Sequence, residues 1–394
     1  MKNKRLITSS IAALLGAGLT LGVAPASAKN ETVVSRAVDL TTDVTVTPVV
    51  DGLEHPWGMA WLPNGDILVT ERPGRLRLIR DGKLLAGSIG GTPDVFVRGQ
   101  GGLLDVAVHP NFVDNNFVYL TYAHGTSDAN RTRVARAVLD GMALKDLEVI
   151  FEVAEQKPGP QHFGSRLLWL PDGTLLVSIG DGGNPPVAID GKLIRLRAQD
   201  RSSYIGKIVR INDDGSIPQD NPFVASDGAA PAVWSLGHRN VQGMAFNPVR
   251  QEVWINEHGA LRGDELNRVE PGGNYGWPAV THSRDYRGAT EISPHTSLPD
   301  MNDPALVWME TQAPSGLAAY DGARFPDWRG DLFSGGLVSQ QVRHIKLDDT
   351  GNVREERSIV IGARVRDVKQ GPDEYLYVLT DEGNGRLLRL EPAG

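Results

Sequence analysis

The sequence predicts an all-β protein, a six-bladed β-propeller of four-stranded antiparallel blades. Three observations favour this fold class: one hairpin pattern recurs along the chain, helical periodicities between the copies are few, and 45 glycines supply turns. Repeated antiparallel units of this kind pack as blades around a central channel. A β-sandwich or two small barrels would also contain many short strands, but neither predicts the same hairpin opening again and again.

The recurring unit is a short alternating apolar run, a turn rich in Pro, Asn, Asp or Gly, and a second β-rich run. These turn residues supply the backbone angles that join antiparallel strands. Six stretches follow the pattern: GMAWLPNGDILVTE (58–71), LLDVAVHPNFVDNNFVYLTY (103–122), SRLLWLPDGTLLVSIGD (165–181), GMAFNPVRQEVWINEHG (243–259), GLAAYDGARFPDWRGDLFSGG (316–336) and VRDVKQGPDEYLYVLTDE (365–382). Each stretch therefore predicts two strands joined by a turn.

The N-terminus carries the pattern of a cleavable secretory signal. A basic start at Lys2, Lys4 and Arg5 precedes the apolar run IAALLGAGLTLGVA, and the triplet ASA ends at Ala28. We therefore assign residues 1–28 to a signal peptide and expect a periplasmic or secreted protein, cleaved near Ala28. The apolar run is too short to span a bilayer and no later stretch replaces it, so no membrane anchor is expected.

Residues 29–46 are polar and β-prone, and they either lead into the propeller or donate the strand that closes its ring. We assign them as a lead-in segment. All-β propellers of this length are often one unit, so residues 47–394 are assigned to a single catalytic domain, which we expect to be monomeric.

Composition excludes several classes of function. Loss of the leader's three basic residues changes the formal charge from −8 to −11, the wrong sign for binding nucleic-acid phosphates. The chain contains no cysteine. Disulfides, a thiolate nucleophile, a cysteine metal site and a lipid-anchor cysteine are therefore all excluded.

Unusual polar residues lie just before the first strand of several units, and equivalent loops of a propeller meet at one end of the channel. They are Gln100 in RGQGGLLD, His162 in PQHFGSRL, Arg239 and Asn240 in GHRNVQGM, and Arg364 and Arg366 in ARVRDV. A loop histidine more often caps a turn than catalyses, and each arginine alone could bond backbone carbonyls or surface carboxylates. Three arginines facing one cavity repel one another, so the set predicts a polycarboxylate or phosphate ligand.

The stretch NEHGALRGDELNRVEPGGNYGWP, residues 256–278, suits a hard cation. Closely spaced Glu257, Asp264 and Glu265, with glycines that free backbone carbonyls, provide the oxygen ligands that calcium prefers. The spacing does not match an EF-hand, and a solvated acidic loop is the alternative interpretation. The stretch SIGDGG, residues 178–183, also looks metal-like, but we interpret it as a strand-end turn.

Six motifs, taken in order, span nearly the whole mature chain: HFGSRL, GKIVRIN, GHRNVQGMAFNP, NEHGALRGDELN, GGNYGWP and RVRDVKQGPDEYLYVLTDE. Together they resemble the soluble PQQ-dependent aldose sugar dehydrogenases, relatives of soluble quinoprotein glucose dehydrogenase. The resemblance implies a six-bladed propeller that binds pyrroloquinoline quinone (PQQ) and calcium and oxidises aldose sugars at the anomeric carbon to lactones. It also implies an electron acceptor, which no motif identifies.

The resemblance further implies a role for each loop residue. His162 matches the general base that takes the proton from the anomeric hydroxyl while hydride passes to the quinone. Arg239 and Asn240 match positions at the quinone's reactive end, where they stabilise developing negative charge. The other matched cofactor-binding positions are Gln100, Tyr286, Arg364 and Arg366. The carboxylates of PQQ are then the anion that the arginines require.

Two calcium sites are implied as well. The backbone carbonyls of Gly259 and Ala260 match ligands of a calcium that touches PQQ and polarises the reacting carbonyl. Glu265 and the carbonyl of Tyr275 match a second, structural site.

Three positions depart from the family pattern. Ala260 stands where many members have proline, so the fixed geometry of proline is lost. Val338 falls where relatives have a lysine that reaches the cofactor. Gln161 precedes His162 where the glucose-dehydrogenase branch has aspartate, which predicts a neutral hydrogen-bond partner for His162. These departures bear on cofactor affinity and rate rather than on reaction type.

Two other functions are compatible with a propeller. A calcium-dependent, lactonase-like hydrolase would need several carboxylates from different blades, whereas the loops bring arginines, a glutamine and a histidine. A non-catalytic binding propeller would not need both His162 and the Arg239–Asn240 pair. Nicotinamide cofactors are not expected, because the sequence lacks a Gly-rich strand–turn–helix fingerprint.

Overall fold

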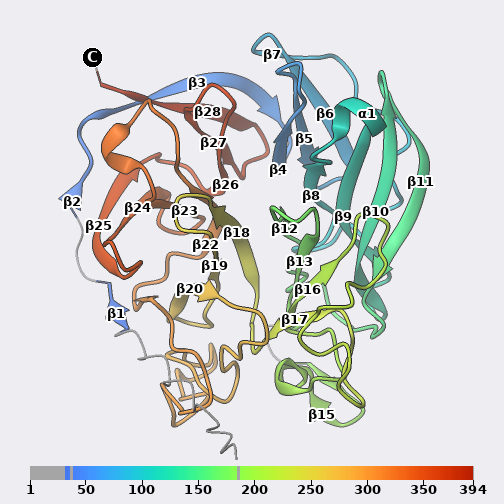
Figure 1. The fold of residues 1–394 in the computed structure, drawn as a ribbon, viewed down its shortest axis with the longest axis vertical. Helices are drawn as coiled ribbons and strands as arrows, with labels where there is room; N and C mark the ends of the chain where they lie inside the picture. Colours follow the sequence, from blue (N-terminus) through green and yellow to red (C-terminus); the bar gives the residue numbers. More distant parts are fainter. Residues whose placement is uncertain (1–31, 36–38, 184–186, 394) are drawn as a thin grey trace, which may run out of the picture.

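The computed structural model of the protein describes residues 32–35, 39–183 and 187–393 (Figure 1). It confirms the predicted fold class, because six sheets of mainly antiparallel strands surround one axis as a β-propeller. We number the blades 1 to 6 in chain order. The signal peptide assigned to residues 1–28 lies outside the described residues.

The first strands of neighbouring blades contact one another around the axis. Blade 1 comprises β4 (Pro56–Trp61), β5 (Ile67–Glu71), β6 (Arg75–Arg80) and β7 (Lys83–Leu84). Blade 2 comprises β8 (Leu103–Val108), β9 (Phe117–Gly125), β10 (Asn130–Asp140) and β11 (Ala143–Glu152). Blade 3 comprises β12 (Leu167–Trp169), β13 (Leu175–Ile179), β16 (Lys207–Ile211) and β17 (Val233–Leu236).

The second half of the ring repeats this order. Blade 4 comprises β18 (Val241–Asn247), β19 (Glu252–Glu257), β20 (Asp264–Val269) and β21 (Leu306–Trp308). Blade 5 comprises β22 (Pro314–Ala319), β23 (Leu332–Gly336), β24 (Gln341–Leu347) and β25 (Val353–Val360). Blade 6 comprises β26 (Val365–Gln370), β27 (Leu376–Thr380), β28 (Gly385–Pro392) and the N-terminal strand β3 (Val44–Leu53). The six recurring stretches thus form the first two strands of the six blades, as two antiparallel strands each.

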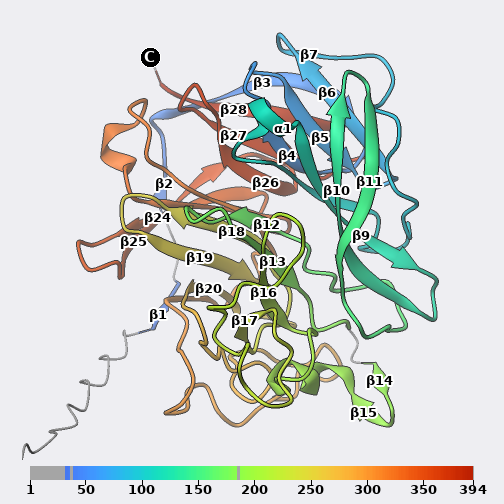
Figure 2. The same ribbon diagram turned by 45° about the vertical axis from the view of Figure 1, so that its right-hand side comes forward.

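Within the described residues, helix is confined to short turns. The elements are α1 (Phe112–Asn115) between β8 and β9, the 3₁₀ turn η1 (Ile194–Gln199) in blade 3, and the 3₁₀ turn η2 (Pro326–Trp328) between β22 and β23. A small hairpin of β14 (Ala188–Ile189) and β15 (Lys192–Leu193) precedes η1 and lies at the edge of the molecule (Figure 2). The described part of the chain contains no helix with the length and hydropathy that a membrane span requires.

The N-terminal segment closes the ring and covers two blade edges. Strand β3 pairs antiparallel with β28, so blue and red ribbons lie side by side in Figure 1. Strands β1 (Val33–Val34) and β2 (Asp39–Leu40) pair in parallel with β21 and β25, so blades 4 and 5 have five strands where four were predicted. The closing strand begins at Val44, inside the segment assigned as a lead-in.

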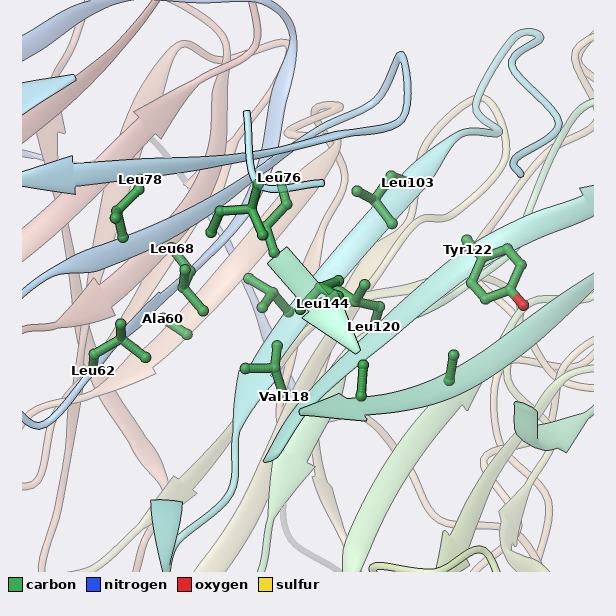
Figure 3. Close-up of a cluster of buried hydrophobic side chains, with 14 residues drawn as sticks. Ala60, Leu62, Leu68, Leu76, Leu78, Leu103, Val118, Leu120, Tyr122 and Leu144 are labelled. Carbon is green, nitrogen blue, oxygen red and sulfur yellow. The ribbon is translucent and has the colours of Figure 1, made fainter. Parts of the chain in front are cut away.

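Apolar side chains are buried between blades, because each sheet packs its faces against its two neighbours. Six buried clusters fill the six interblade spaces. Figure 3 shows the cluster between blades 1 and 2, where Leu68 and Leu76 pack with Val118 and Leu120. Because alternate residues of a strand point to opposite faces, each blade supplies residues to the clusters on both of its sides.

The buried side chain of Arg166, just before β12, ties the first strands together at the axis. Its Nε donates to the carbonyl oxygen of Gln242 in blade 4 at 2.5 Å. Its Nη2 donates to the carbonyl oxygen of Arg366 in blade 6 at 2.8 Å. The guanidinium also lies 4.0 Å from the ring centroid of Trp57 in blade 1. These three contacts join the cation to blades 1, 4 and 6.

Two buried carboxylates compensate the charge of Arg166. Its Nη1 lies 3.1 Å from Oδ1 of Asp367 and 3.5 Å from Oδ1 of Asp105. Lys369 is the second cation, with Nζ 3.8 Å from Asp105 and 3.9 Å from Asp367. A buried charge network of this kind is stable only while every member has its partner.

We predict that Arg166→Met lowers the free energy of unfolding by about 3–5 kcal/mol, because it leaves two buried carboxylates with one cation. Arg131→Met is the matched control, because Arg131 pairs with the exposed Glu152 and should cost less than about 1 kcal/mol. Denaturant titrations of both variants and the parent give the two differences. Equal losses in the two variants would contradict a central role for Arg166.

Candidate active site

Connecting loops meet at one end of the axis around a cavity of about 430 Å³, lined by residues from all six blades and their loops. Of the residues predicted from the sequence, Gln100, Arg364 and Arg366 line this cavity directly. Arg366 lies inside β26, whereas we predicted that it lies in the loop just before that strand. The structure thus brings blades 2 and 6 together as the repeat pattern predicts.

His162 lies just behind the cavity wall. Its side chain is 2% exposed, while the next two residues, Phe163 and Gly164, line the cavity. The backbone of His162 has a φ of 52°, a left-handed conformation that is uncommon outside glycine and is often found at functional sites. Its N–H donates to Oε1 of Gln100 at 2.8 Å, so two of the predicted residues are directly connected.

The ring of His162 is paired with a carboxylate. Nδ1 of His162 lies 2.6 Å from Oδ1 of the buried Asp181, so in the neutral ring Nδ1 carries the proton and Nε2 remains an acceptor. The prediction of a neutral partner, made from Gln161, was wrong. The interpretation of SIGDGG as only a turn was also wrong, because Asp181 belongs to it. Oδ2 of Asp181 also accepts from Nε1 of Trp277 at 2.9 Å.

Glycines on both sides of Asp181 allow this loop to approach the histidine. A Cβ on Gly180 would lie 2.2 Å from the carbonyl oxygen of His162. Gly182 has a φ of 83°, and a Cβ there would lie 2.6 Å from Cδ of Lys157. No side chain fits at either position, so the glycines of SIGDGG are the sequence signal for this close packing.

The surroundings of the histidine–aspartate pair, His162 and Asp181, favour a neutral ring. Burial and the positive charge of Arg239 lower the pKa of His162, and the Asp181 carboxylate opposes them only in part. Burial raises the pKa of Asp181, but its contacts with His162 and the charge of Arg239 outweigh burial, so this pKa lies below its usual range. A neutral imidazole oriented by an ionised carboxylate can accept a proton at Nε2.

Arg239 extends the site towards the loop after β19. Its guanidinium lies 5.3 Å from the ring centroid of Trp277, whose Nε1 bonds the histidine–aspartate pair. Nη1 of Arg239 donates to the carbonyl oxygens of His258, at 2.9 Å, and of Gly259. The cation therefore lies between the proton-accepting ring and a carbonyl predicted to bind calcium.

Asn240 braces the loop that carries the histidine. Its Oδ1 accepts from the N–H of Gly164 at 3.2 Å. Gln242, two residues further on, donates from Nε2 to the carbonyl oxygen of Gly164 at 3.0 Å and lines the cavity. The sequence analysis did not single out Gln242, although it lies in the motif GHRNVQGM.

The arginines of blade 6 surround an aspartate that the sequence analysis missed. Nη2 of Arg366 lies 2.5 Å from Oδ2 of Asp381, and Nη2 of Arg364 lies 3.7 Å from the same oxygen. Burial raises the pKa of Asp381, but the charge of Arg366 outweighs burial and holds it well below its usual range. The expectation of uncompensated arginines is therefore corrected, because Asp381 balances one of them.

Unsatisfied donors nevertheless remain at the cavity. The Nε atoms of Arg366 and Arg72 are buried and have no hydrogen-bond partner among the described residues. Both side chains line the cavity. Buried donors of this kind are expensive unless a ligand or water accepts from them.

One of the two residues predicted to bind the first calcium, Gly259, lines a narrow second pocket, and Ala260 does not. Arg239 and Glu265 line this pocket too, and His258 lines both this pocket and the main cavity. Ala260 is buried, and its N–H donates to Oγ of Ser283 at 3.1 Å. Among the described residues no three His, Cys, Asp or Glu side chains form a metal site, so a calcium here would need backbone carbonyls in addition to the carboxylates of Glu257 and Glu265 that line the pocket.

The residues predicted for the second calcium are less clearly grouped. Burial and the neighbouring Glu257 carboxylate raise the pKa of Glu265 well above its usual range. Tyr275 is buried, with its ring 5.0 Å from the ring of His238. Tyr286 is 48% exposed and does not line the main cavity, so its contact with a cofactor stays a prediction.

Comparison with known proteins identifies the family. The family model described as Glucose / Sorbosone dehydrogenase matches residues 53–389, most of the chain. The chain belongs to the glucose/sorbosone dehydrogenase family. This family membership confirms the recognition made from the six motifs and identifies the protein as an oxidoreductase of the sugar dehydrogenase class.

Relatives of this glucose/sorbosone dehydrogenase carry consistent names. Aldose sugar dehydrogenase YliI of Escherichia coli is 38% identical over 89% of this chain and 93% of its own length. Quinoprotein glucose dehydrogenase B of Acinetobacter calcoaceticus is 28% identical over 84% of each chain. The PQQ-bound structure of an aldose sugar dehydrogenase from Streptomyces coelicolor is 28% identical, with a TM-score of 0.71, over 90% of this chain and 99% of that chain.

We predict that Asp181→Asn lowers sugar-oxidising turnover of this dehydrogenase by about a hundredfold or more, because the amide no longer orients the imidazole. The Asp181 carboxylate raises the pKa of His162, so its loss should also move the acid limb of kcat/KM to lower pH. Steady-state kinetics across pH measure both effects. Asp220→Asn is the control, since Asp220 is exposed; turnover of Asp181→Asn within a few-fold of this control would contradict the assignment.

Proposed function

We propose that this protein oxidises aldoses at the anomeric carbon to lactones with PQQ and calcium, using His162 as the general base. The observation that carries the proposal is the buried His162, whose Nδ1 is paired with Asp181 directly behind an arginine-lined cavity. The PQQ-bound relative and the quinoprotein relative support the choice of cofactor.

The residues of the main cavity fit a planar polycarboxylate. The unpartnered Nε atoms of Arg366 and Arg72 would donate to its carboxylates, and Arg364 adds a partly exposed cation at the same end. Arginine binds carboxylates in a fork geometry, which favours it over lysine for such a ligand. Val338 lines the cavity and is 55% exposed, so the lysine that relatives have there is replaced by an apolar contact.

The chain's own residues would move the proton and stabilise charge. With Nδ1–H held by Asp181, Nε2 of His162 would accept the proton of the anomeric hydroxyl. The guanidinium of Arg239 would stabilise negative charge that develops nearby, because its position is fixed by carbonyls and by Trp277. Bound PQQ would supply the oxidant that accepts hydride from the sugar.

Calcium is the second proposed cofactor. The carbonyl oxygens of Gly259 and Ala260 would hold it, where it would act as a Lewis acid. The Gly259 carbonyl already accepts from Arg239, but a carbonyl oxygen has two lone pairs. The raised pKa of Glu265, caused by burial and by the Glu257 carboxylate, supports a second cation there, because a cation would relieve this repulsion.

The alternative of a calcium-activated hydrolase lacks its expected ligands at the cavity. Among the residues that line it, Asp381 is the one carboxylate, and Arg366 engages it. Ser235, His238 and Glu257 form a serine–histidine–carboxylate chain, with 2.8 Å and 3.1 Å between neighbours. The hydroxyl of Ser235 is completely buried, so this chain is structural.

We predict that apoprotein mixed with PQQ and calcium oxidises a range of aldoses in a dye-linked assay, and that NAD does not replace PQQ. His162→Gln should keep a near-native melting temperature and bind PQQ, yet lose about a hundredfold or more in turnover, because an amide cannot accept the proton. Turnover with NAD, or none with any aldose, would contradict the function. Turnover of His162→Gln within a few-fold of the parent would assign the base elsewhere.

We also predict that calcium stabilises the native fold. A ligand that binds only the native state raises the unfolding midpoint by mass action, so chelation should lower the melting temperature and release PQQ. Differential scanning calorimetry with and without chelator measures the first effect, and the visible spectrum of PQQ after gel filtration measures the second. An unchanged midpoint together with unchanged activity in excess chelator would remove calcium from the mechanism.

A further inference from the structure

A buried lysine, Lys157, lies beside the proposed base, and neither the sequence motifs nor the mechanism above uses it. Its side chain is 3% exposed. Its Nζ donates to two neutral acceptors, Oδ1 of Asn130 at 2.9 Å and the carbonyl oxygen of Gly159 at 3.0 Å. A buried ammonium usually has a carboxylate in direct contact, so a cation held by neutral oxygens requires an explanation.

Lys157 contacts both loops that carry the histidine–aspartate pair. Its ammonium lies 4.1 Å from the ring centroid of Phe163, the residue after His162. Its aliphatic chain packs on Gly182, the residue after Asp181, so closely that a Cβ there would lie 2.6 Å from its Cδ. The lysine itself does not line the cavity, and its contacts with Phe163 and Gly182 hold the spacing of the two loops.

We propose that Lys157 is a positioning residue for His162: it braces the two loops, and its buried positive charge helps to keep the imidazole in its neutral, proton-accepting form. The inference rests on the proposed role of His162 as base. By this proposal Lys157 keeps His162 able to accept a proton at neutral pH. The proposal also gives a reason for a buried cation whose desolvation lowers the stability of the fold.

The charges around the histidine support this assignment. The charges of Arg239 and Lys157 both oppose protonation of His162, and the Asp181 carboxylate favours it. Burial lowers the pKa of Lys157 to about 7, and the Asp181 carboxylate opposes this shift. Lys157 is therefore partly charged at neutral pH and fully charged below it, which is the range in which the base would otherwise become protonated.

Lys207 provides a matched control. It is also completely buried, and burial lowers its pKa to about 7 as well. Its Nζ donates to the carbonyl oxygens of Arg197, Ala198 and Ile205, at the end of the 3₁₀ turn η1. Loss of Lys207 should therefore cost stability without removing the brace between the two loops of the site.

The test follows the titration of His162 in the apoprotein by NMR of histidine-labelled samples, with its resonance assigned by its absence in His162→Gln. In Lys157→Met we expect the titration midpoint of His162 to rise by about half a pH unit or more, because a positive charge is lost. In Lys207→Met we expect it to stay within the error of the parent. If Lys157→Met unfolds at neutral pH, Lys157→Gln replaces it, since it keeps a donor for Asn130.

Kinetics of protein loaded with PQQ and calcium give the second readout. In Lys157→Met the acid limb of kcat/KM should move to higher pH, in parallel with the NMR midpoint, while Lys157→Arg should restore the parent profile. An unmoved His162 midpoint in both neutral variants would overturn the proposal, and so would an equal rise in Lys207→Met. If the loaded parent oxidises no aldose, the proposed function fails, whereas the apoprotein titration still decides the effect of Lys157 on His162.

Discussion

The contacts of the Arg166 guanidinium at the axis are the interaction on which the rest of the propeller depends. Apolar packing between blades is strong but non-directional, so by itself it would tolerate small slips of one sheet against the next. Hydrogen bonds from one cation to the carbonyls of Gln242 and Arg366 are directional, and they fix the heights of two blades relative to a third. Asp105 and Asp367 make the burial of this cation tolerable and bring a further blade into the same network.

The site inherits its geometry from this axis. The backbone carbonyls of Gln242 and Arg366 accept hydrogen bonds from Arg166, and the same two residues line the cavity. The buried network at the axis and the cavity wall therefore share residues. The buried ionisable groups near the cavity are stabilised in different ways. Arg366 pairs with the Asp381 carboxylate, the lowered pKa of His162 favours a neutral ring beside Asp181, and Lys157 donates to neutral oxygens. These differences follow from which loops meet at each point. As a result, charged and neutral groups lie side by side at this end of the channel.

The sequence predicted the parts of this structure that depend on local pattern. Alternating runs and turn residues are properties of neighbouring positions, so all six hairpins and the fold class were recognised, whereas the roles that the family motifs assign to His162 and Arg239 stay predictions. Asp181 was missed because its role arises only where its loop meets the His162 loop. The error over Gln161 has the same origin, because the chain neighbour of a histidine is seldom its partner in space. The burial of Lys157 could not be predicted, since nothing in EQKPGPQH indicates it. The pairing of Asp381 with Arg366 could not be predicted either, because it depends on how the fold brings the two residues together.

Closure of the ring by β3 bears on the order in which parts of the propeller form during folding. Strand β3 precedes all six recurring stretches in the chain, whereas its partner β28 follows the last of them; Gly52 and Asn384 are hydrogen-bonded although 332 positions separate them. Without this pairing the six blades would form an open arc, and the apolar cluster between blades 6 and 1 would lose the contribution of β3. Contacts between such distant segments form slowly, because the entropy of closing a long loop is lost before the contact forms. We therefore expect closure of the ring, which depends on a contact of high sequence separation, to come late in folding.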